Sequence, residues 1–246
     1  MQDEPRLEDQ AISKVAEMLL STQIDAADKL DVDVHADLGK LVQGQTGSIS
    51  ISGERLVTQQ DLQIKEIDLQ IDQVDVNLFS ALLGKIELNQ PIDSTGKIVV
   101  TETDINRNLN SDYLRSRPIG LEVTVEGQPV LLTFQAPMKI QLPGNGKVIF
   151  SSDIQILEKG EHRSVHFTGA VYPRTDQHSV LMESFSLGEG QSLSIELMAA
   201  FMDRLRELID APYINLGDMA FQIQRMEVHQ GSIDLFVKLK MNQIPV

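Results

Sequence analysis

The chain has 246 residues and carries 36 acidic against 21 basic side chains, which gives a formal net charge of −15. This charge repels phosphate backbones and anionic membrane surfaces, so it argues against a nucleic-acid partner and against electrostatic docking on such a membrane. No cysteine is present, which excludes disulfides, thiolate catalysis and cysteine-ligated zinc. The apolar content of 41%, with only 4% aromatic residues, predicts a sizeable aliphatic core.

The beginning of the chain, Met1 to Pro5, is acidic where a signal peptide would be basic and then apolar. The longest wholly apolar run, residues 197–202, is far shorter than the roughly 20 residues that span a bilayer. As the sequence stands, we expect a cytoplasmic protein or one peripheral to a membrane. A periplasmic location would follow if a signal or anchor had been removed.

Residues 7–24 place their apolar side chains at helical spacing and predict an amphipathic helix. Its polar positions hold several acids and a single base, Lys14. We therefore expect the apolar face to pack on the core, and docking on a membrane surface is the weaker alternative.

Residues 30–37 alternate strictly, which is typical of a strand with one buried and one solvated face. The polar face carries three aspartates and a histidine, a row that resembles a set of metal ligands. Side chains two apart on a strand lie roughly 7 Å from each other, too far to form a metal cage without other ligands. We expect a solvated face here, and a second short strand over residues 48–53.

The central feature is the stretch 62–110, a ladder of alternating apolar and polar residues that leads into a helix. Its apolar positions change phase near residues 65–66 and again near 72–73. A one-residue slip moves side chains to the opposite face, so each change predicts a bulge or a turn. Because bulges bend strands, we expect a curved sheet. At the end of the ladder, Thr101 and Asp104 have the spacing of a capping box for a helix over 102–114.

The second half, from Gly120 onward, is mostly β, with short turns between the predicted strands. Strands joined in this way favour an antiparallel sheet. The clearest helix of the chain follows over residues 192–209, with one apolar stripe, and it ends before Pro212.

Catalytic and metal signals are weak. The four-residue spacing of His162 and His166 would suit zinc on a helix, but their surroundings are strand-like, where this spacing is roughly 13 Å. No Gly-x-Ser-x-Gly elbow of a serine hydrolase occurs. No pair of carboxylates stands apart from the acidic surface, so a carboxylate-based hydrolase stays open but unsupported. We predict no catalytic residue, no metal and no cofactor.

Three segments of the first half match the order of elements in a known family. They are the segment 74–84, Pro91, and Val100 to Asn106, whose sequence looks like that family's signature Leu-Thr-Glu-Ala-Asp-Leu-Asn. On these residues the chain resembles the LmeA-like phospholipid-binding family of actinobacteria and cyanobacteria. The preceding helix and first strand also fit, and the resemblance is looser beyond Gly120.

Members of this family are similar to tubular lipid-binding (TULIP-like) proteins, in which an apolar groove between a curved sheet and a long helix accepts acyl chains. The resemblance implies one α+β domain over 1–246. It would have a strongly curved, mostly antiparallel sheet wrapped around a long amphipathic helix. Residues 1–116 form the better-matched half, and 117–246 form a β-rich half that contains the helix 192–209.

The resemblance implies non-catalytic binding of a phospholipid or other acyl lipid in an apolar groove between the ladder and the helix 192–209. Whether the lipid is transferred, stored or sensed stays open. A transient membrane contact is compatible with this role, and the identity of any protein partner stays open. The candidates for the groove lining are Leu62, Ile64, Leu69, Met198, Phe201, Met202 and Leu205.

Arginines that flank the capped helix could meet a phosphate headgroup, although exposed arginines are common without such a role. The headgroup candidates are Arg107, Arg115 and Arg117. Two alternatives from other classes remain: an acidic structural or interaction protein with a filled core, and a hydrolase with two carboxylates across a cleft.

Overall fold

The structure is a computed structural model, in which the chain forms two compact units. Unit 1 comprises residues 1–99, 212–224 and 235–246, and unit 2 comprises residues 100–211 and 225–234. The residues described are 24–35, 45–46, 48–58, 61–71, 74–75, 92–116, 119–173, 181–209, 214–216 and 219–241. The predicted helix 7–24 and the predicted phase change near 72–73 lie outside these residues.

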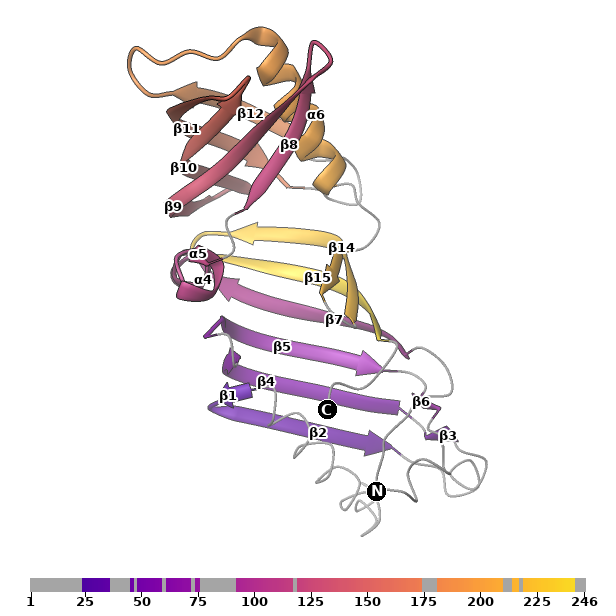
Figure 1. Cartoon of the computed structure of the whole chain (residues 1–246). Helices are drawn as coiled ribbons and strands as arrows, with labels where there is room; N and C mark the ends of the chain where they lie inside the picture. The colour runs from indigo at the N-terminus through magenta and orange to yellow at the C-terminus, as the bar shows by residue number, and fades with distance from the viewer. Residues whose placement is uncertain are drawn as a thin grey trace. The chain divides into compact units, whose positions relative to one another are not determined.

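An eight-stranded sheet makes up most of unit 1, with the order β1-β4-β5-β7-β15-β14-β13 and β2 also paired with β4 (Figure 1). Its strands are β1 (Ile24–Ala26), β2 (Lys29–His35), β4 (Ser48–Thr58), β5 (Gln63–Ile71), β7 (Ile92–Thr101), β13 (Ile214–Leu216), β14 (Met219–His229) and β15 (Ser232–Met241). The short strands β3 (Gln45–Thr46) and β6 (Val74–Asp75) pair separately. The strand predicted over 48–53 is confirmed as the first part of β4, and the strand predicted over 30–37 is confirmed as β2 as far as His35, since residues 36–37 lie outside those described.

The chain changes face along β4 and β5 at the predicted place near residues 65–66. Arg55 of β4, opposite Lys65, has a φ of 48°, a left-handed conformation that is uncommon for a residue with a side chain. A Cβ atom at Gly53 would lie 3.0 Å from a Leu56 methyl group, so residues 53 and 56 lie on the same face of the sheet. In a regular strand, residues three apart point to opposite faces. The predicted bulge or turn is wrong: β5 continues through residues 65–66, and its register with β4 is the same on both sides of Arg55, so both strands change face together without an inserted residue.

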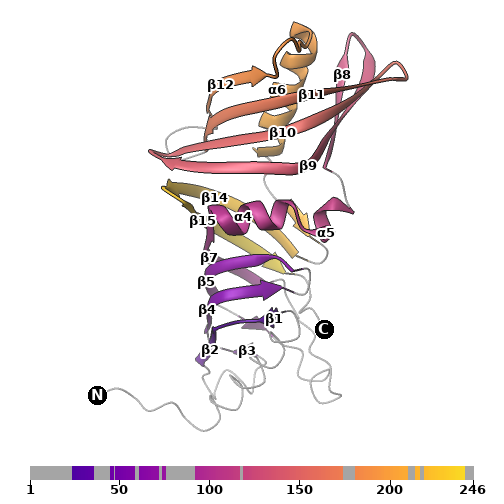
Figure 2. The same ribbon diagram turned by 90° about the vertical axis from the view of Figure 1, so that its left-hand side faces the viewer.

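Unit 2 contains a five-stranded antiparallel sheet of order β12-β11-β10-β9-β8, which curls beside one helix, α6 (Ile195–Ile209) (Figure 2). Its strands are β8 (Gly120–Val125), β9 (Gln128–Gly144), β10 (Lys147–Glu158), β11 (Glu161–Tyr172) and β12 (Leu181–Leu187). The core lies between the sheet and α6. It consists of Leu121, Val123, Val125, Val130, Leu132, Phe134, Met138, Ile154, Ile156, Val165, Phe167, Leu197 and Phe201.

Two helix boundaries differ from the prediction, and a serine side chain caps the helix that begins at each of them. The predicted helix 102–114 is two helices, α4 (Glu102–Leu109) and α5 (Asp112–Arg115), and the Ser111 hydroxyl caps the second one. The helix predicted over 192–209 begins at Ile195, since the Leu197 N–H donates to the Ser194 hydroxyl at 3.2 Å.

The predicted fold class is confirmed in its coarse form, a mostly antiparallel α+β protein with a curled sheet. The prediction that the ladder wraps around a long amphipathic helix, and with it the likeness to tubular lipid-binding domains, is not supported. Helix α6 has 15 residues and packs on β8 in unit 2, whereas β5 and residues 92–99 of β7 belong to unit 1. An apolar stripe predicts that a helix has a buried face, but not which strands that face covers. None of the described helices is long and apolar enough to span a membrane.

Candidate functional site

One face of the unit 1 sheet is apolar across four adjacent strands. Its central row runs from Val32 in β2 through Ile51 and Leu69 to Gly96 in β7, since each residue is paired with the next. Residues paired across strands share a face of the sheet, whereas neighbours along a strand alternate between faces. We call this surface the apolar face. Its described members are Leu30, Val32, Ile49, Ile51, Leu56, Ile64, Ile67, Leu69, Ile71 and Ile98.

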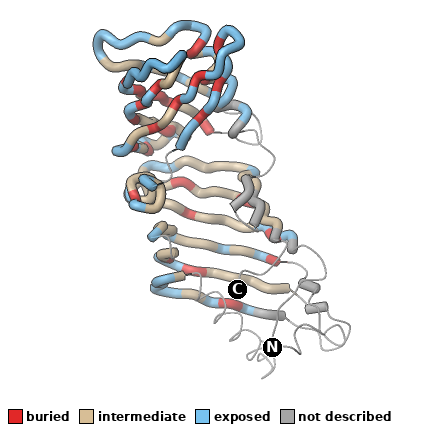
Figure 3. Tube along the Cα trace, in the orientation of Figure 1, coloured by how far each residue is buried: buried red, intermediate tan, exposed pale blue. Residues whose placement is uncertain are grey.

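The side chains of the apolar face are only partly removed from solvent. Val32 and Ile71 are buried, but Ile51, Leu69 and Ile98 are half-buried, as the tan segments of Figure 3 show for these strands. The described helices pack elsewhere, α4 on β9 and α6 on β8. A sheet with one apolar face is usually covered on that face by another apolar layer.

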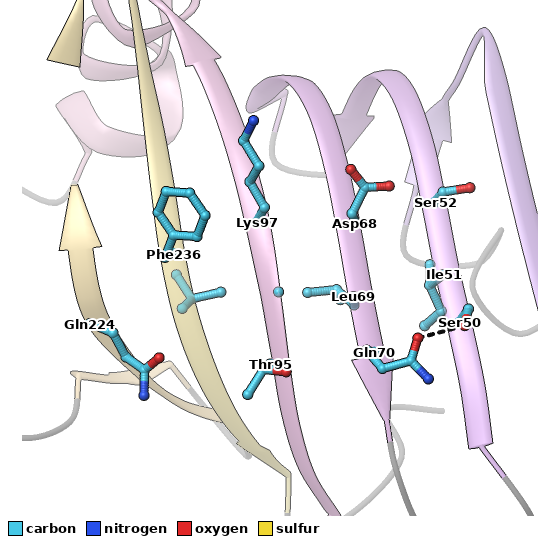
Figure 4. A pocket seen from close by; sticks show the side chains of 12 residues that line it. Ser50, Ile51, Ser52, Asp68, Leu69, Gln70, Thr95, Lys97, Gln224 and Phe236 are labelled. Atoms are coloured by element: carbon cyan, nitrogen blue, oxygen red, sulfur yellow. Dashed lines mark hydrogen bonds between the residues drawn. The ribbon is translucent and has the colours of Figure 1, made fainter. Parts of the chain in front are cut away.

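Gly96 shapes the β7 end of the central row. A Cβ atom at this position would lie 2.4 Å from Leu69 Cδ2 and 2.4 Å from the Asp68 carbonyl oxygen. The Leu69 side chain therefore occupies the space above Gly96, and Figure 4 shows it pointing from β5 toward β7. Only glycine permits this close approach, because any side chain at position 96 would displace Leu69.

A shallow hollow of about 430 Å³ lies on the same strands (Figure 4). This volume lies within the range of roughly 300–1,000 Å³ that is usual for small-molecule sites. The hollow is lined by residues of the central row together with the polar residues that flank them along each strand: Ser50, Ile51, Ser52, Asp68, Leu69, Gln70, Thr95, Gly96, Lys97, Gln224, Phe236 and Val237. Ser50, Asp68 and Gln70 belong to the opposite, polar face of the sheet, because side chains alternate along a strand. On that face Ser50 donates to the Gln70 side-chain oxygen at 2.7 Å, and Asp68 is paired across strands with Lys97.

The groove candidates from the ladder come together on the sheet. Leu69 lies in the central row of the apolar face, and Ile64 shares that face because it pairs with Leu56 beyond Arg55. Leu62 immediately precedes β5, where its N–H donates to the Thr58 hydroxyl at 3.2 Å. These candidates belong to unit 1.

The groove candidates from the helix belong to unit 2. Phe201 is 2% exposed and packs in the core between the rings of Phe134 and Phe167, with centroid distances of 6.3 and 5.7 Å. Met198 and Met202 are half-buried on α6. The side chain of Leu205 lies outside the described residues. Phe201 therefore helps to fill a core, and the candidates from ladder and helix fall in separate units.

The headgroup candidates lie around the capped helix. Arg107 is exposed in the last turn of α4, and Arg115 is exposed at the end of α5. Arg117 lies outside the described residues. Both described arginines belong to unit 2.

The segment that carries the family signature begins with the predicted capping box. The Asp104 N–H donates to the Thr101 hydroxyl at 3.1 Å, and the Thr101 N–H donates to the Asp104 carboxylate at 3.2 Å. The capping box is confirmed, and it satisfies two of the backbone groups exposed at the start of α4.

Sequence reasoning missed a ladder of side chains that joins α4 to the edge of β9. Glu102 accepts from the Leu142 N–H at 2.6 Å. The Asn106 side-chain oxygen accepts from the Ile140 N–H at 2.7 Å, and its amide donates to the Ile140 carbonyl at 2.8 Å.

Asn110 repeats this pattern one turn later, with bonds of 2.9 and 2.7 Å to the N–H and carbonyl of Met138. Four residues of helix rise about 6 Å and two residues of strand about 6.7 Å, so the two spacings match. Side chains of α4 and its C-cap thus form the hydrogen bonds to the edge of β9 that a neighbouring strand would otherwise form. The sequence shows polar residues at positions 102, 106 and 110, four residues apart, but it does not show which strand they contact.

Comparison with known proteins gives one match. A sequence model of the family described as LmeA-like phospholipid-binding matches residues 5–236, which includes parts of both units. No curated protein and no solved structure matches the chain.

Proposed function

Because the chain belongs to the LmeA-like phospholipid-binding family, we propose that it binds a phospholipid and holds the acyl chains against the apolar face. The family supports a lipid as the ligand class. The location rests on one observation, the central row that crosses four strands from Val32 to Gly96, in which the apolar side chains of Ile51 and Leu69 are only half-buried. An acyl chain is a layer of the kind that such a face requires.

The energetics favour a ligand with two acyl chains. Each methylene group removed from water contributes about 0.8 kcal/mol, so ten of them contribute about 8 kcal/mol. Association costs offset at least about 4 kcal/mol of this gain. One short chain would then bind weakly, whereas a second chain on the same molecule adds burial without a second association cost. A phospholipid is therefore favoured over a single fatty acid.

The proposed site is confined to the apolar face of unit 1, and it does not include Met198, Met202, Arg107 or Arg115, which belong to unit 2. The proposed role is non-catalytic, because binding is the activity that the family description names.

Introducing a carboxylate at Leu69 is expected to reduce phospholipid uptake at least tenfold. Leu69→Glu places a charge in the central row, where burial under an acyl chain would be costly. Gln70→Glu is the matched control, because it adds the same group one residue away, on the polar face. Uptake of a fluorescent phospholipid from phosphatidylcholine vesicles is the measurement, with thermal melting to show that each variant is folded.

A folded Leu69→Glu variant that takes up lipid like the wild type would contradict the proposed location. Leu69→Ala, which removes apolar area without adding charge, serves if the glutamate variant does not fold. Wild-type protein that takes up no phospholipid at all would contradict lipid binding and favour the interaction protein.

A further inference from the structure

We propose that Glu227, His229 and Asp234 bind a divalent cation of the Zn²⁺ type. The inference is independent of the proposed lipid binding. Glu227 and His229 lie two residues apart on β14, and so on the same face of that strand. Asp234 lies on the neighbouring strand β15, past the turn at Gly231. One ligand atom from each of the three residues lies within 4.8 Å of the other two.

The spacing between His229 and Asp234 carries this inference. The His229 Nε2 atom lies 3.6 Å from the Asp234 Oδ2 atom, which is too long for a hydrogen bond. Two ligands of one tetrahedral zinc ion, each bound at about 2.0–2.1 Å, lie about 3.3 Å apart. A shift of a few tenths of an ångström would therefore allow both atoms to coordinate one ion.

The chemistry of the donors fits the same class of ion. One imidazole nitrogen and two carboxylate oxygens form a ligand set that zinc accepts, with a fourth position left for water. Magnesium and calcium, by contrast, prefer oxygen ligands alone. A bound cation would place a positive charge between the two carboxylates, whose nearest ligand atoms lie within 4.8 Å of each other.

The surroundings hold part of the site in place and leave part accessible. The Asp234 side chain is 13% exposed, whereas the His229 side chain is 53% exposed and open to an ion from solvent. Arg225 lies 3.2 Å from one oxygen of Glu227 and orients that carboxylate. The turn between the strands is fixed within unit 2, since Gly231 donates to the Leu142 carbonyl and accepts from the Glu102 N–H.

Calorimetric titration with ZnCl₂ tests the site, using the full chain after treatment with a chelator and dialysis. Wild-type protein is expected to bind one ion in a site that His229→Ala and Asp234→Asn each weaken at least tenfold. His162→Ala is the matched control, because it removes another exposed histidine, on β11, and is expected to leave the affinity unchanged.

Three results would overturn the proposal. These are no stoichiometric uptake of Zn²⁺ by the wild type, an unchanged affinity in a folded His229→Ala variant, and a tighter affinity for Mg²⁺ than for Zn²⁺. Because the readout is metal binding alone, failure here is distinguishable from failure of the proposed lipid binding.

Discussion

Truncation of Phe201 to alanine is expected to lower the free energy of unfolding of the protein by about 3–5 kcal/mol, the usual cost of removing a buried phenyl ring. Phe201 is 2% exposed and packs against Phe134 and Phe167, so the truncation would leave a cavity beneath α6. Urea unfolding followed by circular dichroism measures the loss. Ile195→Ala on the same helix is the control, because Ile195 is 82% exposed and its truncation should change stability by about 0.5 kcal/mol or less.

The same variant distinguishes a core residue from a residue that lines a groove. If Phe201→Ala kept the stability of the wild type but lost phospholipid uptake, Phe201 would line an open groove, as expected from sequence. If it lost stability while the folded fraction still took up lipid, Phe201 would be a core residue of unit 2. The burial of its ring predicts the second result.

Replacing Asn106 with aspartate is expected to destabilise the protein by about 2–4 kcal/mol. The carboxylate can still accept from the Ile140 N–H, but it cannot donate to the carbonyl oxygens of Ile140 and Glu102. The part-buried Ile140 carbonyl left without its donor costs about 1–3 kcal/mol, and repulsion between the new carboxylate and both carbonyl oxygens adds to this cost. Urea unfolding at pH 7 measures the effect, with Thr103→Ala as a control at an exposed position of the same helix.

The pH dependence of Asn106→Asp provides a second test. Once protonated, the introduced carboxyl group can donate one of the two missing hydrogen bonds. The stability difference between variant and wild type should therefore shrink at acidic pH. A difference that is negligible at pH 7, or that grows on acidification, would contradict the role of Asn106 as a link between α4 and β9.

Local patterns predicted those features that depend on residues close together in the chain. The strict alternation over 30–37 and 48–53 placed Val32 and Ile51 on one side of their strands, and the register confirms that they share the apolar face. The spacing of Thr101 and Asp104 predicted the capping box for the same reason. Even the change of face near Lys65 was visible as a shift in apolar phase.

Features that depend on distant pairing were not predictable in the same way. The apolar stripe of α6 could not show that Phe201 packs on the β8–β12 sheet, because amphipathicity specifies a face and not its partner. The α4 ladder was hidden for a related reason. Asn106 and Asn110 bond to backbone groups some 30 residues away, and any backbone group could have satisfied them.

The family signature and the proposed lipid surface lie in different parts of the molecule. The residues of the signature cap α4 and anchor it to β9 in unit 2, through Thr101 and Asn106. The proposed acyl-chain surface lies on β2, β4, β5 and β7 of unit 1. A motif that identifies the family can therefore serve stability, while the aliphatic positions of the apolar face are the ones proposed to bind the ligand.

Photocrosslinking tests the central claim most directly. The protein is loaded with a phospholipid that carries a diazirine in one acyl chain, irradiated, and mapped at residue level by mass spectrometry. Adducts are expected on the apolar face, above all at Ile51 and Leu69, and should disappear when excess unlabelled phospholipid is added. Adducts confined to the polar residues of the same strands, such as Ser52 and Gln70, or confined to unit 2, would contradict the claim.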